Sequence, residues 1–380
     1  ISKLAPTRRV SQTLLGREES LLSSIRDLYL NSADQGRLLD ESVIHLESEL
    51  DHLWSEIEKY DPEYVSLRRG RPLDFSQIRS LVSSQGDGVC LLEYFFSSDK
   101  LLIFVLRSDS PDLQVEEVDF PADRLSYYLK HYSDEFLNPQ IGQHDFGQVW
   151  QGLSKYLVDP IIKHLDGIET IYMVPFRQLH YLPLHALRHN GQYLVERYKV
   201  VYSPSASVIG YCQNKRRAPN LDLKSLVVGV AKEGDSEHLR QLIEGEADRV
   251  GAVLGKGSQV FKGDQMTKEL IRQESQGKDI IHFSCHGFFD THIPMRSGLQ
   301  LADGVLTVED IYQLNLNASL VTLSACQTGL SEHKPGDDLT GLTRSLLYAG
   351  TPSVLVSLWS VPATSTFELM ERFYTHLRDG

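Results

Sequence analysis

Residues 280–287 read IIHFSCHG, and residues 320–329 read LVTLSACQTG. Each segment is an apolar, strand-like run that ends in a reactive side chain followed by glycine or small polar residues. Strand-like and helix-like segments alternate around them from Leu226 to Leu377, which predicts a mostly parallel sheet covered by helices on both faces. Ligands of such sheets bind at the carboxyl ends of the strands, so the two segments mark the expected functional edge.

His286 and Cys326 are the reactive side chains at these two strand ends. If the strands are parallel neighbours, both side chains emerge at the same edge of the sheet. A thiol attacks a carbonyl as its thiolate, and a neighbouring imidazole can take the thiol proton and later give it to a leaving amine. The backbone N–H groups of Gly287 and Cys326 are candidates for stabilising the developing oxyanion. The pattern therefore indicates a Cys–His pair.

Two other interpretations of these residues stay open at this point. A free cysteine is most often a small buried hydrophobic residue, and a histidine at a strand end is most often simply hydrogen-bonded. A metal site is the other alternative, although His282, Cys285 and His286 lack a second ligand pair at zinc-finger spacing. Cys285 is also a rival nucleophile, but it lies inside the strand, so we expect it in the core.

The composition is that of a globular protein. A chain of 380 residues with 41% apolar residues can form two or three domains with a sizeable core. Its 38 Lys and Arg against 51 Asp and Glu give a net charge of −13, which disfavours a general nucleic-acid binder. The longest apolar runs, such as Leu101–Leu106, are too short to span a bilayer. Four scattered cysteines and no signal-peptide pattern predict a cytoplasmic protein.

Three regions are predicted along the chain. Residues 1–70 carry apolar side chains at helical spacing, which predicts a helical hairpin and the end of a helical repeat array. Residues 71–220 contain two strand-like runs that predict a β-hairpin, and they end in a basic, proline-containing linker over 213–220. Residues 221–380 form the alternating α/β region that carries the Cys–His pair.

Several further motifs occur in a fixed order around this pair. They are SCHG (284–287), SGL (297–299), LTVEDI (306–311), LSACQTG (323–329), GD (336–337), AG (349–350), SLWSV (357–361) and FY (373–374). In this order they resemble the CHAT domain, a caspase-like cysteine protease family that is akin to separases and is often fused to tetratricopeptide repeats. Residues 174–187 and 53–70 resemble the amino-terminal half of that family and the segment before it.

The resemblance implies both a fold and a reaction. The fold is a caspase-like, mostly parallel α/β sheet flanked by helices, with an inactive pseudo-protease half over 71–220 and a catalytic half over 221–380. The reaction is hydrolysis of a peptide bond through a thioester, with Cys326 as the nucleophile and His286 as the general base. The resemblance implies no metal or organic cofactor, and no third catalytic residue is identifiable in the sequence.

The resemblance also implies where a protein substrate binds. In caspase-like proteases an extended substrate segment pairs with the strand that follows the catalytic pair. The candidate substrate-binding residues are Ser297, Asp337, Ser357, Leu358, Trp359 and Ser360. A core aromatic is the alternative for Trp359, a turn residue for Ser297, and a solvated loop carboxylate for Asp337. The residue preferred before the cut stays open.

By the same resemblance, we expect an enzyme that is latent until a regulatory protein binds its helical amino-terminal region. An RNA-guided, CRISPR-associated effector in antiviral defence of bacteria is one candidate partner, and neither a membrane nor direct nucleic-acid binding is favoured. The chain departs from the family at Phe176-Arg177, where an acidic residue is usual, and we expect both ends to be truncated. A non-catalytic caspase-like scaffold is the alternative function.

Overall fold

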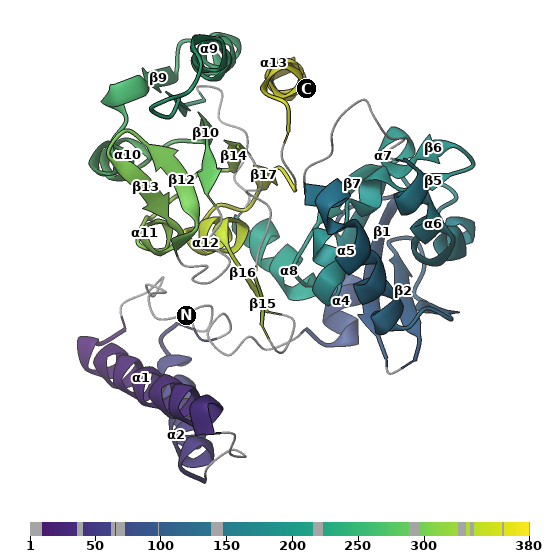
Figure 1. The fold of residues 1–380 in the computed structure, drawn as a ribbon. Helices are drawn as coiled ribbons and strands as arrows, with labels where there is room; N and C mark the ends of the chain where they lie inside the picture. Colours follow the sequence, from purple (N-terminus) through teal and green to yellow (C-terminus); the bar gives the residue numbers. More distant parts are fainter. Residues whose placement is uncertain are drawn as a thin grey trace. The chain divides into compact units, whose positions relative to one another are not determined.

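The computed structural model falls into two compact units, Ile1–Leu73 and Asp74–Gly380. The structure describes residues 10–35, 41–61, 65, 73–97, 99–137, 147–215, 223–288, 296–325, 332–334, 338–358 and 361–379. Four predicted site residues lie outside these ranges, namely Cys326, Asp337, Trp359 and Ser360. Figure 1 shows the elements of both units.

The first unit contains two long helices, α1 (Gln12–Gln35) and α2 (Glu41–Ile57). Apolar side chains at helical spacing form one stripe on each helix, and the stripes pack against each other. Their shared core includes Leu21, Ile25, Leu50, Leu53 and Ile57. Beside this core, Trp54 Nε1–H donates a hydrogen bond to Glu18 Oε1 at 2.7 Å. Both helices are those that the apolar spacing predicts.

The second unit begins with a five-stranded sheet in the order β3-β2-β1-β4-β7. The strands are β1 (Val89–Phe96), β2 (Leu101–Arg107), β3 (Gln114–Val118), β4 (Thr170–Val174) and β7 (Lys199–Tyr202). β1, β4 and β7 run parallel, whereas β2 and β3 add an antiparallel meander. The β1–β2 hairpin is the one that the two apolar runs predict.

Helices cover both faces of this first sheet. Those that contribute to the two cores are α4 (Phe75–Ser83), α5 (Ala122–Leu137), α6 (Gly147–Leu157) and α8 (Ala206–Lys215). One core joins Leu125 of α5 and Leu157 of α6 to Leu92 of β1, and the other joins Val82 of α4 and Ile209 of α8 to the opposite face. A short helix, η1 (Asp159–His164), precedes β4. The short elements between β4 and β7 are η2 (Arg177–Tyr181), η3 (Leu184–Ala186), β5 (Arg188–His189), β6 (Gln192–Tyr193) and α7 (Leu194–Arg197).

A second five-stranded sheet has the order β17-β14-β10-β8-β9, and every pairing in it is parallel. Its strands are β8 (Ser225–Val230), β9 (Ser258–Lys262), β10 (Ile280–Cys285), β14 (Leu320–Ser324) and β17 (Val354–Val356). Its helices are α9 (Glu237–Leu254), α10 (Lys268–Glu274), α11 (Val308–Tyr312), α12 (Leu342–Tyr348) and α13 (Ala363–Asp379). Alternation of strand and helix predicts this architecture.

The second sheet is buried on both faces, because every residue of β8 and β10 is buried. On one face, Val227 and Ile280 pack with Val250 of α9 and Met370 of α13. On the other face, alternate residues such as Phe283 pack with α10, α11 and α12. This arrangement (Figure 1) is the predicted mostly parallel α/β sheet flanked by helices.

A smaller antiparallel sheet follows β10 directly. It consists of β11 (Gly287–Phe288), β12 (Gly298–Leu301) and β13 (Gly304–Thr307). A Cβ atom at Gly298 would lie 2.2 Å from the backbone oxygen of Leu306, so this close pairing of β12 and β13 requires glycine. The sequence interpretation did not predict this hairpin or β9, because their strands are only four and five residues long.

One boundary differs from the sequence-based prediction. The linker predicted over 213–220 begins too early, since α8 continues to Lys215. The burial of Ala206 and Ile209 stabilises α8, so the helix continues through its polar last turn. The rest of that predicted linker lies outside the described residues. Further along the chain, α12 begins at Leu342, because Asp338–Thr340 form β16, which pairs with β15 (Glu332–Lys334).

Among the described residues, no helix combines the length and the apolar character needed for a membrane span.

A buried polar network links four elements on the α9 and α13 face of the second sheet. His282 of β10 is fully buried, with Nε2 3.0 Å from Glu246 Oε1 of α9 and Nδ1 3.2 Å from the Tyr374 hydroxyl of α13. That hydroxyl donates a hydrogen bond to Thr322 Oγ1 of β14 at 2.7 Å. Each buried polar group therefore finds a partner, and His282 has the structural role that its position inside the strand predicts.

Replacing Tyr374 by Phe tests this network. We expect the substitution to lower the free energy of unfolding by about 1–3 kcal/mol, because His282 and Thr322 would lose a buried partner. Urea unfolding followed by circular dichroism measures the change. Tyr127→Phe is the matched control, because Tyr127 is 57% exposed. Equal losses of stability in the two variants would contradict the importance of the network.

Candidate functional site

The two strand ends singled out in the sequence are direct neighbours in the structure. β10 and β14 pair in parallel, with Ser284 opposite Ser324. Their carboxyl ends therefore lie side by side at one edge of the sheet, as predicted. His286 is the first residue after β10, and Ala325 is the first residue after β14. Cys326 follows Ala325 in the chain and lies outside the described residues.

The imidazole of His286 is one-third exposed and has a carboxylate partner. Its Nε2 lies 2.8 Å from Asp235 Oδ2. The backbone carbonyl of His286 accepts a hydrogen bond from the Gln300 N–H of β12 at 2.9 Å. The histidine is therefore held from two sides, through its ring and through its backbone.

Asp235 belongs to the loop between β8 and α9, and the sequence interpretation missed it. Its side chain is 12% exposed. Its Oδ2 also accepts a hydrogen bond from the Lys232 N–H at 2.7 Å, and its own N–H donates to the Lys232 carbonyl at 3.1 Å. The signal available in the sequence was an acidic residue just beyond β8, the strand that pairs with β10 on the side away from β14.

Gly287 and Ser297 lie in the small sheet beside His286. Gly287 opens β11 and pairs with Leu299 of β12. Ser297 directly precedes β12, is only 2% exposed, and accepts a hydrogen bond from the Val308 N–H through its carbonyl at 2.8 Å. Its burial favours the interpretation of Ser297 as a structural residue of the hairpin over that of a substrate contact.

Ser357 and Leu358 follow β17, the edge strand next to β14. Both residues are half-buried. The Ser357 hydroxyl donates a hydrogen bond to the Ala325 carbonyl. The structure thus brings the residue after β17 to the residue that precedes Cys326, whereas the predicted partners Trp359 and Ser360 lie outside the described residues.

The environment of Cys285 does not suit a nucleophile. Burial raises the pKa of its thiol to about 12, so almost no thiolate forms at neutral pH. Its side chain packs among apolar residues on one face of the sheet, whereas His282 lies on the opposite face in the network with Glu246 and Tyr374. His282, Cys285 and His286 therefore do not converge on a metal ion, and the described residues contain no cluster of three or more such ligands.

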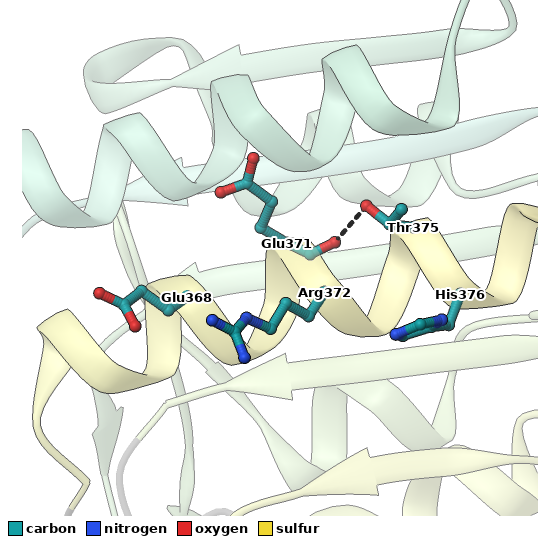
Figure 2. A pocket seen from close by; sticks show the side chains of 5 residues that line it. All are labelled: Glu368, Glu371, Arg372, Thr375 and His376. Atoms are coloured by element: carbon teal, nitrogen blue, oxygen red, sulfur yellow. Dashed lines mark hydrogen bonds between the residues drawn. The ribbon is translucent and has the colours of Figure 1, made fainter.

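A surface pocket of about 390 Å³ lies along α13, away from these residues. It is lined by Glu368, Glu371, Arg372, Thr375 and His376 (Figure 2). Two of these side chains have partners, since Glu371 pairs with Arg249 of α9 at 3.4 Å and the Thr375 hydroxyl donates to the Glu371 carbonyl. Because a single helix face lines this pocket and no candidate site residue reaches it, we assign no chemistry to it.

Thiol alkylation tests the assignment of Cys285 to the core. At pH 8 a thiol of pKa about 12 has roughly 10³-fold less thiolate than a free cysteine of pKa ~8.5. We therefore expect iodoacetamide to leave Cys285 and the equally buried Cys90 unmodified in the native protein. The half-buried Cys212 should react first among these three, as peptide mass spectrometry would show. Alkylation of native Cys285 as fast as in urea would contradict the assignment.

Comparison with proteins of known structure shows the fold. Two solved structures of the Saccharomyces cerevisiae separase–securin complex resemble this chain with TM-scores of 0.51 and 0.57, at 11% and 9% sequence identity. The matches cover 79% and 96% of this chain, and 28% and 38% of the yeast chain. The fold is therefore the caspase-like α/β fold of separase, as predicted.

Comparison of sequences finds longer proteins with a similar segment. Tetratricopeptide repeat protein 28 of Mus musculus is 24% identical in an alignment 255 residues long, which covers 53% of this chain and 10% of that protein. Its Homo sapiens counterpart is 38% identical over 80 residues, 21% of this chain and 3% of that protein. This chain thus spans a tenth or less of the length of these relatives.

A family profile described as the CHAT domain matches residues 148–380. This range is more than half of the chain and includes the whole second sheet with His286 and Asp235. The chain belongs to the CHAT domain family.

Proposed function

We propose that this chain is a caspase-like cysteine endopeptidase, with Cys326 as the nucleophile and His286 as the general base. The register of β10 and β14 carries this proposal, because Ser284 lies opposite Ser324 and each catalytic residue follows two positions later. Ala325, the residue that precedes Cys326 in the chain, follows β14 beside the end of β10, and His286 follows β10 directly. Membership of the CHAT family supports the same assignment.

The proposed reaction is the hydrolysis of a peptide bond through a thioester. His286 takes the proton of the Cys326 thiol, and the thiolate attacks the scissile carbonyl carbon. The N–H groups of Gly287 and Cys326 stabilise the resulting oxyanion. When this intermediate collapses, the C–N bond breaks and His286 gives its proton to the leaving amine. A water molecule, deprotonated by His286, then cleaves the thioester, and the thiol is restored.

The proposed substrate site is the edge of the second sheet at β17. In the described part of this sheet, β17 pairs only with β14, so its other side is available to an extended peptide. The segment from Ser357 to Ser360 would continue this pairing beside the scissile bond. Because the Ser357 hydroxyl is bound to the Ala325 carbonyl, Ser357 would contact substrate through its backbone.

The proposed domain roles follow the predicted boundaries. Residues 1–70 are a helical extension, 71–220 an inactive caspase-like half, and 221–380 the catalytic half. The inactive role is supported by the ends of two parallel strands in that half, since β4 runs into Pro175 and β7 into Ser203. Neither strand has a histidine or a cysteine within the two residues that follow it, whereas β10 is followed by His286 and β14 by Ala325 and Cys326.

Activation by a protein partner at the helical extension is part of this proposal. It is supported by the names of similar proteins, a tetratricopeptide repeat protein and a separase solved together with securin. An RNA-guided effector complex of bacterial defence is the candidate partner. We place this activity in the cytoplasm, where the thiols of Cys90, Cys212 and Cys285 would stay reduced.

Covalent labelling tests the proposed function. A peptidyl acyloxymethyl ketone should modify Cys326 in the full chain, and intact mass should show the adduct. We expect Cys326→Ala to abolish labelling and His286→Ala to slow it by at least ~10²-fold, because the thiol loses its base. Cys212→Ala and His45→Ala serve as matched controls, since Cys212 belongs to α8 and the exposed His45 to α2, and both variants should react like the wild type.

The same assay separates an enzyme from a scaffold. Labelling is repeated with the candidate partner complexes, and a peptide library then reports cleavage. Equal labelling of wild type and Cys326→Ala would refute the assigned nucleophile. Absence of both labelling and cleavage under all these conditions would favour the alternative function, a non-catalytic caspase-like scaffold.

A further inference from the structure

Three neighbouring parallel strands end at the same edge of the second sheet. β8, β10 and β14 are adjacent and parallel. Asp235 lies in the loop after β8, His286 follows β10, and Cys326 comes two residues after β14. Since β10 is the middle strand, His286 has the carboxylate on one side and the strand that leads to the thiol on the other. Neighbouring strands are ~4.8 Å apart, so one imidazole ring can bridge both sides.

The contacts of Asp235 define which ring nitrogen carries a proton. Asp235 Oδ2 accepts a hydrogen bond from the Lys232 N–H and lies 2.8 Å from His286 Nε2. An ionised carboxylate only accepts hydrogen bonds, and a neutral imidazole has one donor and one acceptor nitrogen. The proton therefore resides on Nε2 when Asp235 is ionised, and Nδ1 keeps its lone pair.

We propose that Asp235 is the positioning residue of this site and holds His286 in the Nε2–H form, with Nδ1 as the base toward Cys326. This inference rests on the proposed function, which it extends from a pair to a triad. When the S–H bond breaks, the proton moves to Nδ1 and the imidazolium carries a proton on both nitrogens. The Asp235 carboxylate stabilises this positive charge until Nδ1–H is transferred to the leaving amine.

The surroundings of Asp235 suit a residue that must stay in place. The turn from Lys232 to Asp235 is closed in both directions by the two hydrogen bonds between these residues. The next residue, Ser236, caps α9 by accepting a hydrogen bond from the Leu239 N–H at 3.2 Å. α9 in turn packs tightly on β8, because a Cβ atom at Gly229 would lie 2.8 Å from that of Ala247. Asp235 is thus anchored to the sheet through a fixed helix start.

The test combines a spectroscopic readout that needs no activity with a kinetic one. In the full chain labelled with ¹⁵N-histidine, we expect a downfield ring N–H signal on His286 Nε2, identified by its loss in His286→Gln. Asp235→Ala should remove this signal and slow both ketone labelling of Cys326 and peptide cleavage by at least ~10²-fold, in kcat rather than KM. Asp264→Ala, at an exposed position of the same unit, should change neither readout.

A second variant separates a positioning role from a loss of local structure. Asp235→Asn keeps an acceptor oxygen for the Lys232 N–H but removes the negative charge, so the turn should persist while labelling slows. If Asp235→Ala and Asp235→Asn label as fast as the wild type, or if the His286 ring proton lies on Nδ1, the inference is overturned. If the Nε2–H signal behaves as expected but Cys326 never reacts, the proposed function fails while the assigned contact stands.

Discussion

The parallel pairing of β8, β10 and β14 is the constraint on which the rest of this structure depends. Every residue of β8 and β10 is buried, so a shift of one residue would move each side chain to the opposite face. The register therefore fixes which side chains enter the two cores and also where the strands end. Because the ends coincide, residues far apart in the sequence, Asp235 and His286, meet within hydrogen-bonding distance.

The polar network beneath the site follows from the same register. His282 lies opposite Thr322, and each is four residues before a proposed catalytic residue. Tyr374 and Glu246 complete the network from α13 and α9. A buried polar group without a partner is costly, so this network favours one arrangement of the two helices over the strands. The site edge is thereby supported by a layer whose geometry is set by hydrogen bonds as well as by apolar packing.

Much of this architecture was predictable because long apolar strands alternate with amphipathic helices, as in β8, α9 and β10. The β12–β13 hairpin was not predictable, since its strands are short and it depends on tertiary contacts such as the close approach at Gly298.

At the site, His286 and Cys326 could be identified from the motifs that surround them in the sequence. Asp235 carried only a weak signal, its place after β8, because a single loop aspartate is usually a cap or a solvated charge. The strand order and its contact with His286 are what distinguish it.

The position of Tyr374 near the end of the described chain has a consequence for synthesis on the ribosome. The chain emerges from its amino terminus, and Tyr374 follows His282 by 92 residues. Until α13 has emerged, β10 and β14 can pair and α9 can cover part of this face, but His282 and Thr322 still lack the Tyr374 hydroxyl. Because α13 follows β10 and β14 in the chain, a nascent chain carries the strand ends of the proposed site before their support is complete.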